Sequence, residues 1–355
     1  MPLPAAIVDH FHDQAKASEE LGSQFTALLC RQIADRLDPA QSRFGQRIAA
    51  WPSTLRDDAL SLRAAGGLHA LARSGRVPAL TAAYPPNPTD PAALWAAVVA
   101  AIAAEDAFLF SYLDSPPQTN EVARSSVILG GCLHIARETG LPLEVYEIGS
   151  STGLNLAFDR YRYDLGAGAW GAAASPVTIA SRWEGDLPPV ERTLTIAARA
   201  GCDVRPLDPG SPTDRARLIS YIWPDQALRL ARTHAALTLA AQCPWRVVRA
   251  DAAEWVREGL QRTPASGVTR VIFHTVVWPY LPLATRDSIT HSIHAAGAAA
   301  TASTPLAWLS MEPDEDKGSA AVRLTIWPSG KTRHLGRADF HGRWVKWEYA
   351  TAPRG

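Results

Sequence analysis

A short apolar run that ends in a glycine loop constrains the fold of this chain most. Leu143–Ile148 mixes aliphatic residues with a tyrosine, and Gly149 follows it directly. A run of this length bounded by glycine indicates a buried strand that leads into a tight turn. The residues from Asn155 onward have a helical pattern. Strand, loop and helix in this order are typical of the first unit of a parallel α/β sheet.

The same alternation continues downstream. We expect further strands at Val204–Leu207, Trp245–Val248, Val271–Val277 and Leu306–Met311. Helical stretches separate them at Asp214–Leu239, Ala252–Gln261 and Ala284–Ala300. Strands that alternate with helices predict a parallel sheet with helices on both faces.

The C-terminal end departs from this alternation. Ala321–Trp327 and Thr332–Leu335 flank a Pro-Ser-Gly turn, which predicts an antiparallel hairpin. Trp344–Tyr349 alternates apolar and polar residues and indicates one more strand. Residues 160–200 do not fit a minimal sheet, so we expect an insertion there that carries a small hairpin.

The N-terminal part has a helical pattern throughout. Apolar residues recur at helical spacing in Ala5–Leu21, Phe25–Leu37, Leu62–Ser74, Ala92–Tyr112 and Val122–Thr139. A chain of 355 residues is long enough for two domains. We therefore predict an all-helical domain over residues 1–137 and an α/β domain over residues 138–355.

Composition limits the partners of the protein. Lys plus Arg equals Asp plus Glu at 35 each, so no general attraction to nucleic acid or anionic membranes follows. The four cysteines form no CxxC pair, and the N-terminus has no signal-peptide pattern. His10 and His12 lie on different helix faces, and Ala92–Ala104 is too short for a membrane span. We expect a cytoplasmic protein without a metal site.

The loop after the first strand can be compared with two cofactor templates. The dinucleotide pattern G-x-G-x-x-G fits poorly, because its third glycine would fall on Leu154. The other template has an acidic residue and then glycines at alternate positions, which Glu147, Gly149 and Gly153 match. Ser151 stands at the middle glycine position. The segment resembles motif I of S-adenosylmethionine (SAM) methyltransferases with this one departure.

This resemblance implies a set of cofactor-binding residues. An acid at the end of the second strand binds the ribose hydroxyls, which a carboxylate suits because it accepts two hydrogen bonds. Asp208 is the first choice for this role and Asp203 the second. Asp208 also fits a plain Asp-Pro-Gly turn, and Asp251 also fits a helix cap with Glu254. The full set is Glu147, Gly149, Ser150, Ser151, Gly153, Asn155, Asp208, Asp251 and Ala252.

The segment after the fourth strand is where the resemblance places the methyl acceptor. His274 could serve as a general base, because imidazole titrates near neutrality, or be a buried structural residue. Trp278 and Tyr280 could stack on a flat substrate. The chain has no NPPY-like segment there, which disfavours methylation of nucleic-acid bases. The expected acceptor is a small molecule.

Two other functions remain open. The loop also satisfies G-x-S-x-G, the pattern of a serine hydrolase with Ser151 as nucleophile and Asp251 with His274 or His291 downstream. A hydrolase elbow follows several earlier strands, whereas the first 140 residues here have a helical pattern. The third possibility is a ligand-binding protein of the same fold without catalysis.

Several segments together carry a family resemblance. The polar stretch at Pro117–Ser126 could be a helix cap alone, or it could place Asn120, Glu121 and Arg124 over the loop, because the helix after it leads into the first strand. The run Pro117–Asp164, together with SPVTI, WPDQALRLARTHAALTLA, VVRADAAEW and VIFHTVVWPYL, resembles the bacterial domain-of-unknown-function family 2332. The resemblance implies a helical N-terminal part and a Rossmann-like, methyltransferase-type C-terminal part, and it names no substrate.

Overall fold

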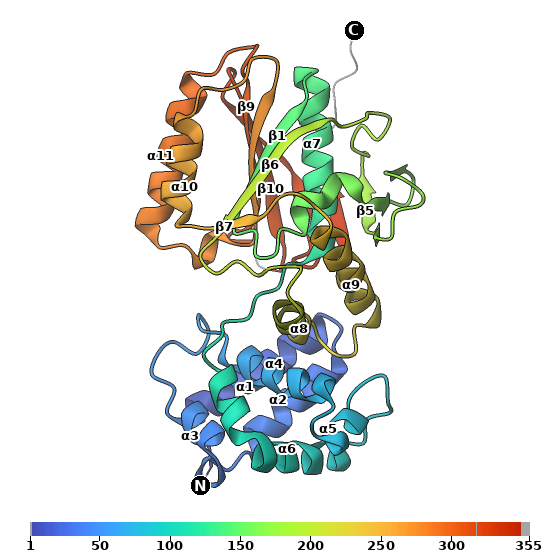
Figure 1. Ribbon diagram of the computed structural model, residues 1–355, viewed down its shortest axis with the longest axis vertical. Coiled ribbons are helices and arrows are strands. Elements are labelled where there is room, and N and C mark those ends of the chain that lie inside the picture. Colours follow the sequence, from blue (N-terminus) through green and yellow to red (C-terminus); the bar gives the residue numbers. More distant parts are fainter. Residues whose placement is uncertain (1, 317, 349–355) are drawn as a thin grey trace. The chain divides into compact units, whose positions relative to one another are not determined.

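The first predicted strand forms where its apolar residues and the following glycine place it. In the computed structural model, which describes residues 2–316 and 318–348, β1 spans Leu143–Ile148. β1 lies inside a nine-stranded sheet with the order β5-β12-β11-β10-β9-β8-β1-β6-β7. The chain is therefore a mixed α/β protein with a helical N-terminal part and a large, mostly parallel sheet (Figure 1).

The chain divides into two compact units. The helical unit comprises Met1–Thr119 and Pro212–His234, and the sheet unit comprises Asn120–Ser211 and Ala235–Gly355. This division differs from the expected boundary at residue 137 in two ways. Helix α7 (Ser125–Thr139) packs against the strands and so belongs to the sheet unit, and a segment after β6 returns to the helical unit.

The helical unit has one apolar core, formed by residues 3–113. Buried side chains such as Phe11, Leu29, Ile33 and Leu68 form this core. The helices are α1 (Ala5–Glu20), α2 (Gln24–Arg36), η1 (Pro39–Gln41), α3 (Arg43–Ala49), α4 (Leu60–Ser74), α5 (Pro78–Ala83), α6 (Pro91–Tyr112), α8 (Pro212–Ser220) and the first half of α9 (Ala227–Ala241). The expectation of a helical N-terminal part is confirmed.

Helix α6 is the one described helix long and apolar enough to cross a membrane. Its side chains Leu94, Val98 and Leu109 are fully buried in the core of the helical unit. A core helix passes the same test of length and composition.

The parallel half of the sheet holds four strands that overlap their predicted ranges, and a fifth, β6, that lies upstream of the predicted second strand. β1 pairs with β6 (Ile196–Asp203) on one side and β8 (Thr269–Thr275) on the other. β7 (Val247–Arg249) extends the sheet beyond β6, and β9 (Leu306–Pro313) extends it beyond β8. All four pairings are parallel.

The C-terminal strands are antiparallel. β9, β10 (Ala320–Trp327) and β11 (Lys331–Ala338) form a meander, which confirms the predicted hairpin. β12 (Trp344–Trp347) adds to β11, and β5 (Arg182–Gly185) pairs with β12 in parallel. Tyr349, the last residue of the strand predicted there, lies outside the described residues.

Two local predictions were wrong, and one predicted helix is of a different type. The second strand is Ile196–Asp203 rather than Val204–Leu207, and Val204 is 63% exposed. The predicted helix Asp214–Leu239 is two helices, α8 and α9, with Pro224 in the break between them. Asn155–Arg160 forms a short 3₁₀ helix, η3, instead of an α-helix.

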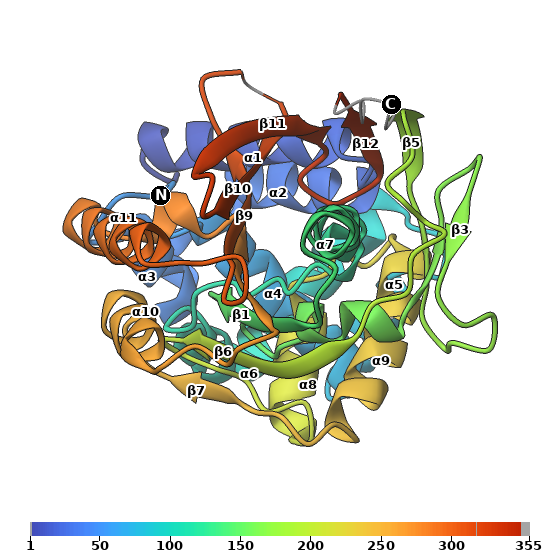
Figure 2. The same cartoon turned by 90° about the horizontal axis from the view of Figure 1, so that it is seen from above.

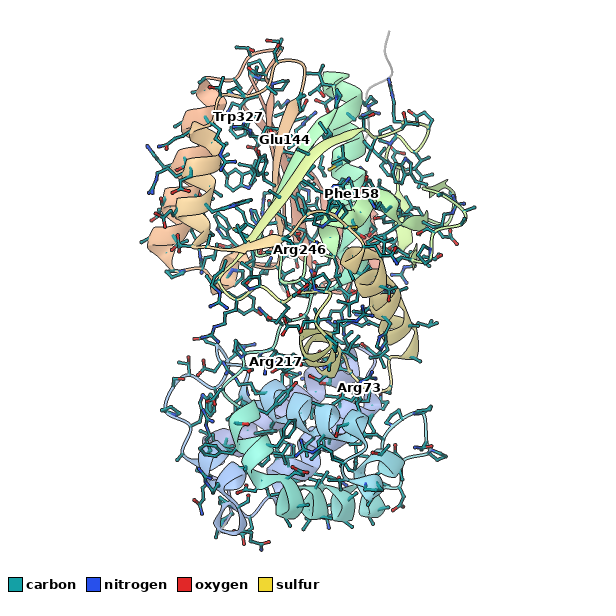
Figure 3. All side chains as sticks on the ribbon, in the orientation of Figure 1. Arg73, Glu144, Phe158, Arg217, Arg246 and Trp327 are labelled. Carbon is teal, nitrogen blue, oxygen red and sulfur yellow. The ribbon has the colours of Figure 1, made fainter. Side chains whose placement is uncertain are left out.

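Helices cover both faces of the parallel strands (Figure 1). α10 (Ala252–Gln261) and α11 (Leu283–Ala298) pack together on one face, where Trp327 lies against Gly297 of α11 (Figure 3). α7 lies on the other face, and the sheet curves around it (Figure 2). A Cβ at Gly131 of α7 would collide with Leu309 of β9, so this glycine permits the close approach.

The insertion folds as a small sheet next to the loop after β1. β2 (Arg162–Asp164) pairs with β3 (Ala169–Trp170) as the expected hairpin, and β4 (Thr178–Ala180) joins in parallel. The hydroxyl of Tyr161 donates to Leu154 O at 2.5 Å, and that of Tyr163 donates to Phe158 O at 2.7 Å. These buried tyrosines fix η3, where Phe158 lies (Figure 3).

Candidate functional site

The sheet has a topological switch point between β1 and β8. The chain leaves β1 toward β6 and β7 on one side, and then returns to β8 and β9 on the other. In open α/β sheets, ligands bind beyond the carboxyl ends of the strands at this point. Two loops lie there, which we call the β1 loop (residues 149–154) and the β8 loop (residues 276–278).

Both loops contain strained backbone. Ser151 has φ of 53° between two glycines that also have positive φ, Gly149 and Gly153. Val276 in the β8 loop has φ of 52°. A left-handed conformation is unfavourable for residues with a Cβ and worst for β-branched ones. Such strain clusters at functional sites, so its presence on adjacent strands supports this position as a site.

The end of β6 holds the first half of the β1 loop. The amides of Gly149 and Ser150 both donate to Cys202 O at 3.0 Å. The amide of Ser151 donates to Asp203 Oδ2 at 2.9 Å, and Asp203 Oδ1 accepts from Arg205 N at 2.8 Å. Asp203 therefore ties the loop to the end of the second parallel strand.

Asn120 holds the second half of the loop. Its buried Oδ1 accepts hydrogen bonds from Thr152 Oγ1 at 2.9 Å and from Leu154 N at 2.8 Å. The polar segment before α7 thus reaches the loop, as its sequence suggested for Asn120. Arg124, from the same segment, donates to Thr275 O at 3.3 Å and to Phe340 O at 2.8 Å. It lies at the end of β8.

Three buried oxygens around the β1 loop lack hydrogen-bond partners among the described residues. They are Glu147 Oε2, Ser151 Oγ and Asn155 Oδ1. Glu147 and Asn155 are only 2% and 1% exposed. A buried polar group left unpaired costs about 1–3 kcal/mol, so such atoms need a ligand or water partner. Each of the three oxygens can accept a hydrogen bond from a ligand or a water molecule.

The Glu147 carboxyl is electrostatically unusual. Burial raises its pKa well above the ordinary value, while hydrogen bonds from Ser150 and Asn155 act in the opposite direction. The negative charge of Asp203 raises it further, and Arg124 lowers it. A positively charged ligand group would favour the ionised form of this carboxyl.

A side chain of the β8 loop lies directly on the β1 loop. A Cβ at Gly149 would collide with Cγ2 of Val277, and one at Gly153 would lie 3.0 Å from Val247 Cγ2. The Val277 contact and the positive φ of Gly149 both favour glycine at this position. A ligand that contacts the Gly149 backbone from this side has to displace Val277.

The β8 loop is fixed by a buried His–Glu pair. His274 Nδ1 lies 2.7 Å from Glu312 Oε1, and His274 Nε2 accepts from Trp308 Nε1 at 3.0 Å. Glu312 also accepts from the amides of Val277 at 3.1 Å and Trp278 at 3.2 Å. Both ring nitrogens of His274 therefore have partners within the protein, and Glu312 links this side chain to the backbone of the β8 loop.

The aromatic candidates differ in their surroundings. Trp278 stacks on the His274 ring with 4.6 Å between centroids, and it packs beside Trp308. Tyr280, at the end of η4 (Trp278–Tyr280), is 73% exposed. Trp278 belongs to the packed wall of the β8 loop, whereas Tyr280 faces solvent.

The acidic candidates also separate. Asp208 is exposed in a turn, where its Oδ1 accepts from Gly210 N at 2.8 Å. Asp203, rather than Asp208, lies at the end of the second parallel strand, where the methyltransferase resemblance places an acid. Asp251 caps α10 by accepting from the amides of Ala253 and Glu254, with Ala252 buried behind it. The sequence ranked Asp203 second because the strand before it consists largely of small residues, which give a weak strand signal.

Metal binding has no support in the part of the chain that the structure describes. No group of three or more His, Cys, Asp or Glu side chains is placed there to hold an ion.

Comparison with known proteins adds a family and no activity. No curated protein and no solved structure matches this chain. One family model matches residues 8–347, which is nearly the whole chain. The chain therefore belongs to the bacterial family described as "Uncharacterized protein conserved in bacteria (DUF2332)".

Proposed function

We propose that this protein is a SAM-dependent methyltransferase that acts on a small molecule in the cytoplasm. The observation that carries the proposal is Asp203, a carboxylate at the end of the second parallel strand that is hydrogen-bonded to the glycine loop of the first. The resemblance to SAM methyltransferases implies an acid at the end of the second strand, where it would bind the ribose hydroxyls.

The unpaired atoms suit this cofactor. All three are oxygens, so they can accept hydrogen bonds from a donor-rich ligand. SAM carries an ammonium group, ribose hydroxyls and a positive sulfonium, and it supplies the transferred methyl group. Glu147 and Asn155 would hold the ammonium end and Asp203 the ribose. Asp251 and Ala252, at the end of the third parallel strand, would hold the adenine.

Methyl transfer by direct displacement needs alignment of donor and acceptor more than proton transfer. The engaged state of His274 is therefore no obstacle. The His274–Glu312 pair fixes the β8 loop beside the β1 loop, and Trp278 presents a rigid wall there. These residues would orient the acceptor and exclude water.

The hydrolase alternative lacks its geometry. A serine nucleophile needs a base within hydrogen-bond reach. Ser151 Oγ has no partner among the described residues, and both nitrogens of His274 bond elsewhere.

Isothermal titration with SAM and with S-adenosylhomocysteine tests the proposal. Asp203→Ala should weaken binding at least ~10-fold, because a charged hydrogen-bond acceptor contributes about 1.5–3 kcal/mol. Asp208→Ala is the matched control, since its exposed carboxylate lies in a turn. It should change the affinity by less than ~2-fold.

Absence of binding by the wild-type chain would refute the proposal, and so would equal losses in the two variants. Turnover separates an enzyme from a binding protein of the same fold. Incubation with SAM and a protein-free extract of bacterial metabolites should yield S-adenosylhomocysteine, measured by mass spectrometry. Binding without this product would favour the non-catalytic alternative.

A further inference from the structure

The helical unit contains an open pocket of its own. Its volume is about 640 Å³, within the range of roughly 300–1,000 Å³ common for small-molecule sites. All its lining residues belong to the helical unit, and they include His69 and Arg73 of α4, Tyr84 and Asn87 after α5, and Asp225 and Leu230 at the start of α9.

Arg73 brings an unmatched positive charge to this pocket. Its side chain contacts His234 Nε2 at 3.3 Å, and no carboxylate lies within ion-pair distance of it among the described residues. Burial lowers the pKa of this arginine, as expected for a charge without a nearby anion. Arg76, on the turn that follows α4, differs because Glu105 binds its guanidinium through both oxygens. The fork of Arg73 remains available for a carboxylate.

The one carboxylate among the lining residues is already engaged. Asp225 accepts from Ser23 Oγ at 2.6 Å and from Phe25 N at 2.9 Å, at the first turn of α2. The positive end of that helix compensates the charge of Asp225. Asp225 therefore serves α2 and leaves Arg73 as the pocket's unmatched charge.

The remaining walls are mainly apolar. Tyr84 stacks with His69 at 6.0 Å between ring centroids, and its buried hydroxyl lacks a hydrogen-bond partner among the described residues. Pro86 and Leu230 add aliphatic surface. Flat rings pack well against such aromatic and proline surfaces.

We propose that this pocket binds a small organic carboxylate with a ring or branched apolar body. The carboxylate pairs with the guanidinium of Arg73, and the apolar body lies against Tyr84, Pro86 and Leu230. This site is separate from the cofactor site of the sheet unit, since none of its residues comes from the β1 or β8 loop.

Fluorine NMR with 4-fluorophenylacetate as the probe tests this assignment on the full chain. The matched neutral compound, 4-fluorophenylacetamide, should bind at least ~10-fold more weakly. Arg73→Gln should reduce the affinity for the carboxylate at least ~10-fold and remove its advantage over the amide. Arg73→Lys should restore part of it, because lysine keeps the charge and loses the fork.

Arg76→Gln is the control, because this nearby arginine is already paired. It should leave the affinity within ~2-fold of wild type. Leu230→Trp, which fills the pocket without changing charge, should abolish binding of both compounds. The assignment fails if the probe does not bind, if acid and amide bind equally, or if the two glutamine variants behave alike.

Discussion

The β1 loop and the β8 loop lie side by side at the switch point, but they differ in how completely the buried polar groups around them are hydrogen-bonded. Each follows a parallel strand and each holds a non-glycine residue at positive φ, Ser151 and Val276. In the β8 loop, Glu312 satisfies both His274 and the backbone amides. Around the β1 loop, three buried oxygens remain unpaired. The comparison teaches that the protein satisfies the buried polar groups of the β8 loop with its own side chains, whereas those around the β1 loop can still accept hydrogen bonds.

The largest expected effect on stability comes from Glu312, which holds the β8 loop. Glu312→Ala removes the partner of His274 and of two amides in a buried site, so we expect a loss of about 3–5 kcal/mol in the free energy of unfolding. Urea denaturation followed by tryptophan fluorescence measures it. Glu312→Gln keeps the shape and should cost clearly less. A loss below ~1 kcal/mol for Glu312→Ala would break the comparison, because the β8 loop would then not depend on this side chain.

The contact between the two loops should give the next effect. Gly149→Ala places a methyl group against Val277 at a positive φ, so we expect a cost of about 2–3 kcal/mol. In a Val277→Ala background the same change should cost about 1 kcal/mol, which is the backbone strain alone. A double-mutant cycle measures the coupling. Strictly additive costs would show that Val277 does not rest on Gly149.

The buried carboxyl of Glu147, next to the β1 loop, should make the stability of the protein depend on pH. The pKa of Glu147 is raised in the folded state, so folding binds a proton there and this group's contribution to stability falls as pH rises above its unfolded pKa near 4.5. Glu147→Gln removes this loss. The variant should therefore gain melting temperature over wild type increasingly from pH 4.5 toward neutrality, as measured by differential scanning fluorimetry. A constant difference across this range would contradict the assignment.

The smallest effect should come from strain relief. Ser151→Gly removes a left-handed non-glycine residue and an unpaired hydroxyl, so unfolding should become harder by about 1 kcal/mol. The same change restores the glycine that motif I has at this position and removes one of the three unpaired oxygens. It should therefore weaken SAM binding less than Asp203→Ala does, because Glu147 and Asn155 keep the other two. Loss of stability would mean that the hydroxyl of Ser151 has a structural partner. The β1 loop would then resemble the β8 loop in having its polar groups satisfied within the protein.

The strand that leads into the β1 loop could be predicted from the sequence, whereas the neighbouring strand β6 could not. Leu143–Ile148 was predicted to the residue, because an apolar run next to a positive-φ glycine leaves little choice. The strand Ile196–Asp203 was missed, since its alanines, glycine and arginine lack the β-branched residues that signal strands. The apolar Val204 drew the prediction four residues or more too far, and Asp208 was preferred to Asp203 as a result.

Long-range contacts lay beyond such reasoning. The partner of His274 is Glu312, 38 residues away on β9, and only the parallel pairing of β8 with β9 brings them together. Asn120 was suspected near the loop because the helix that follows it leads directly into the first strand. Its two hydrogen bonds depend on how the chain enters α7, which no local pattern encodes.

Hydrogen exchange with and without S-adenosylhomocysteine tests the central claim most directly. The account predicts slower exchange in peptides that cover residues 147–155 and 201–208, with little change around Glu312, where the β8 loop is already satisfied. Unchanged exchange in residues 147–155 at saturating ligand, or protection confined to the helical unit, would contradict it.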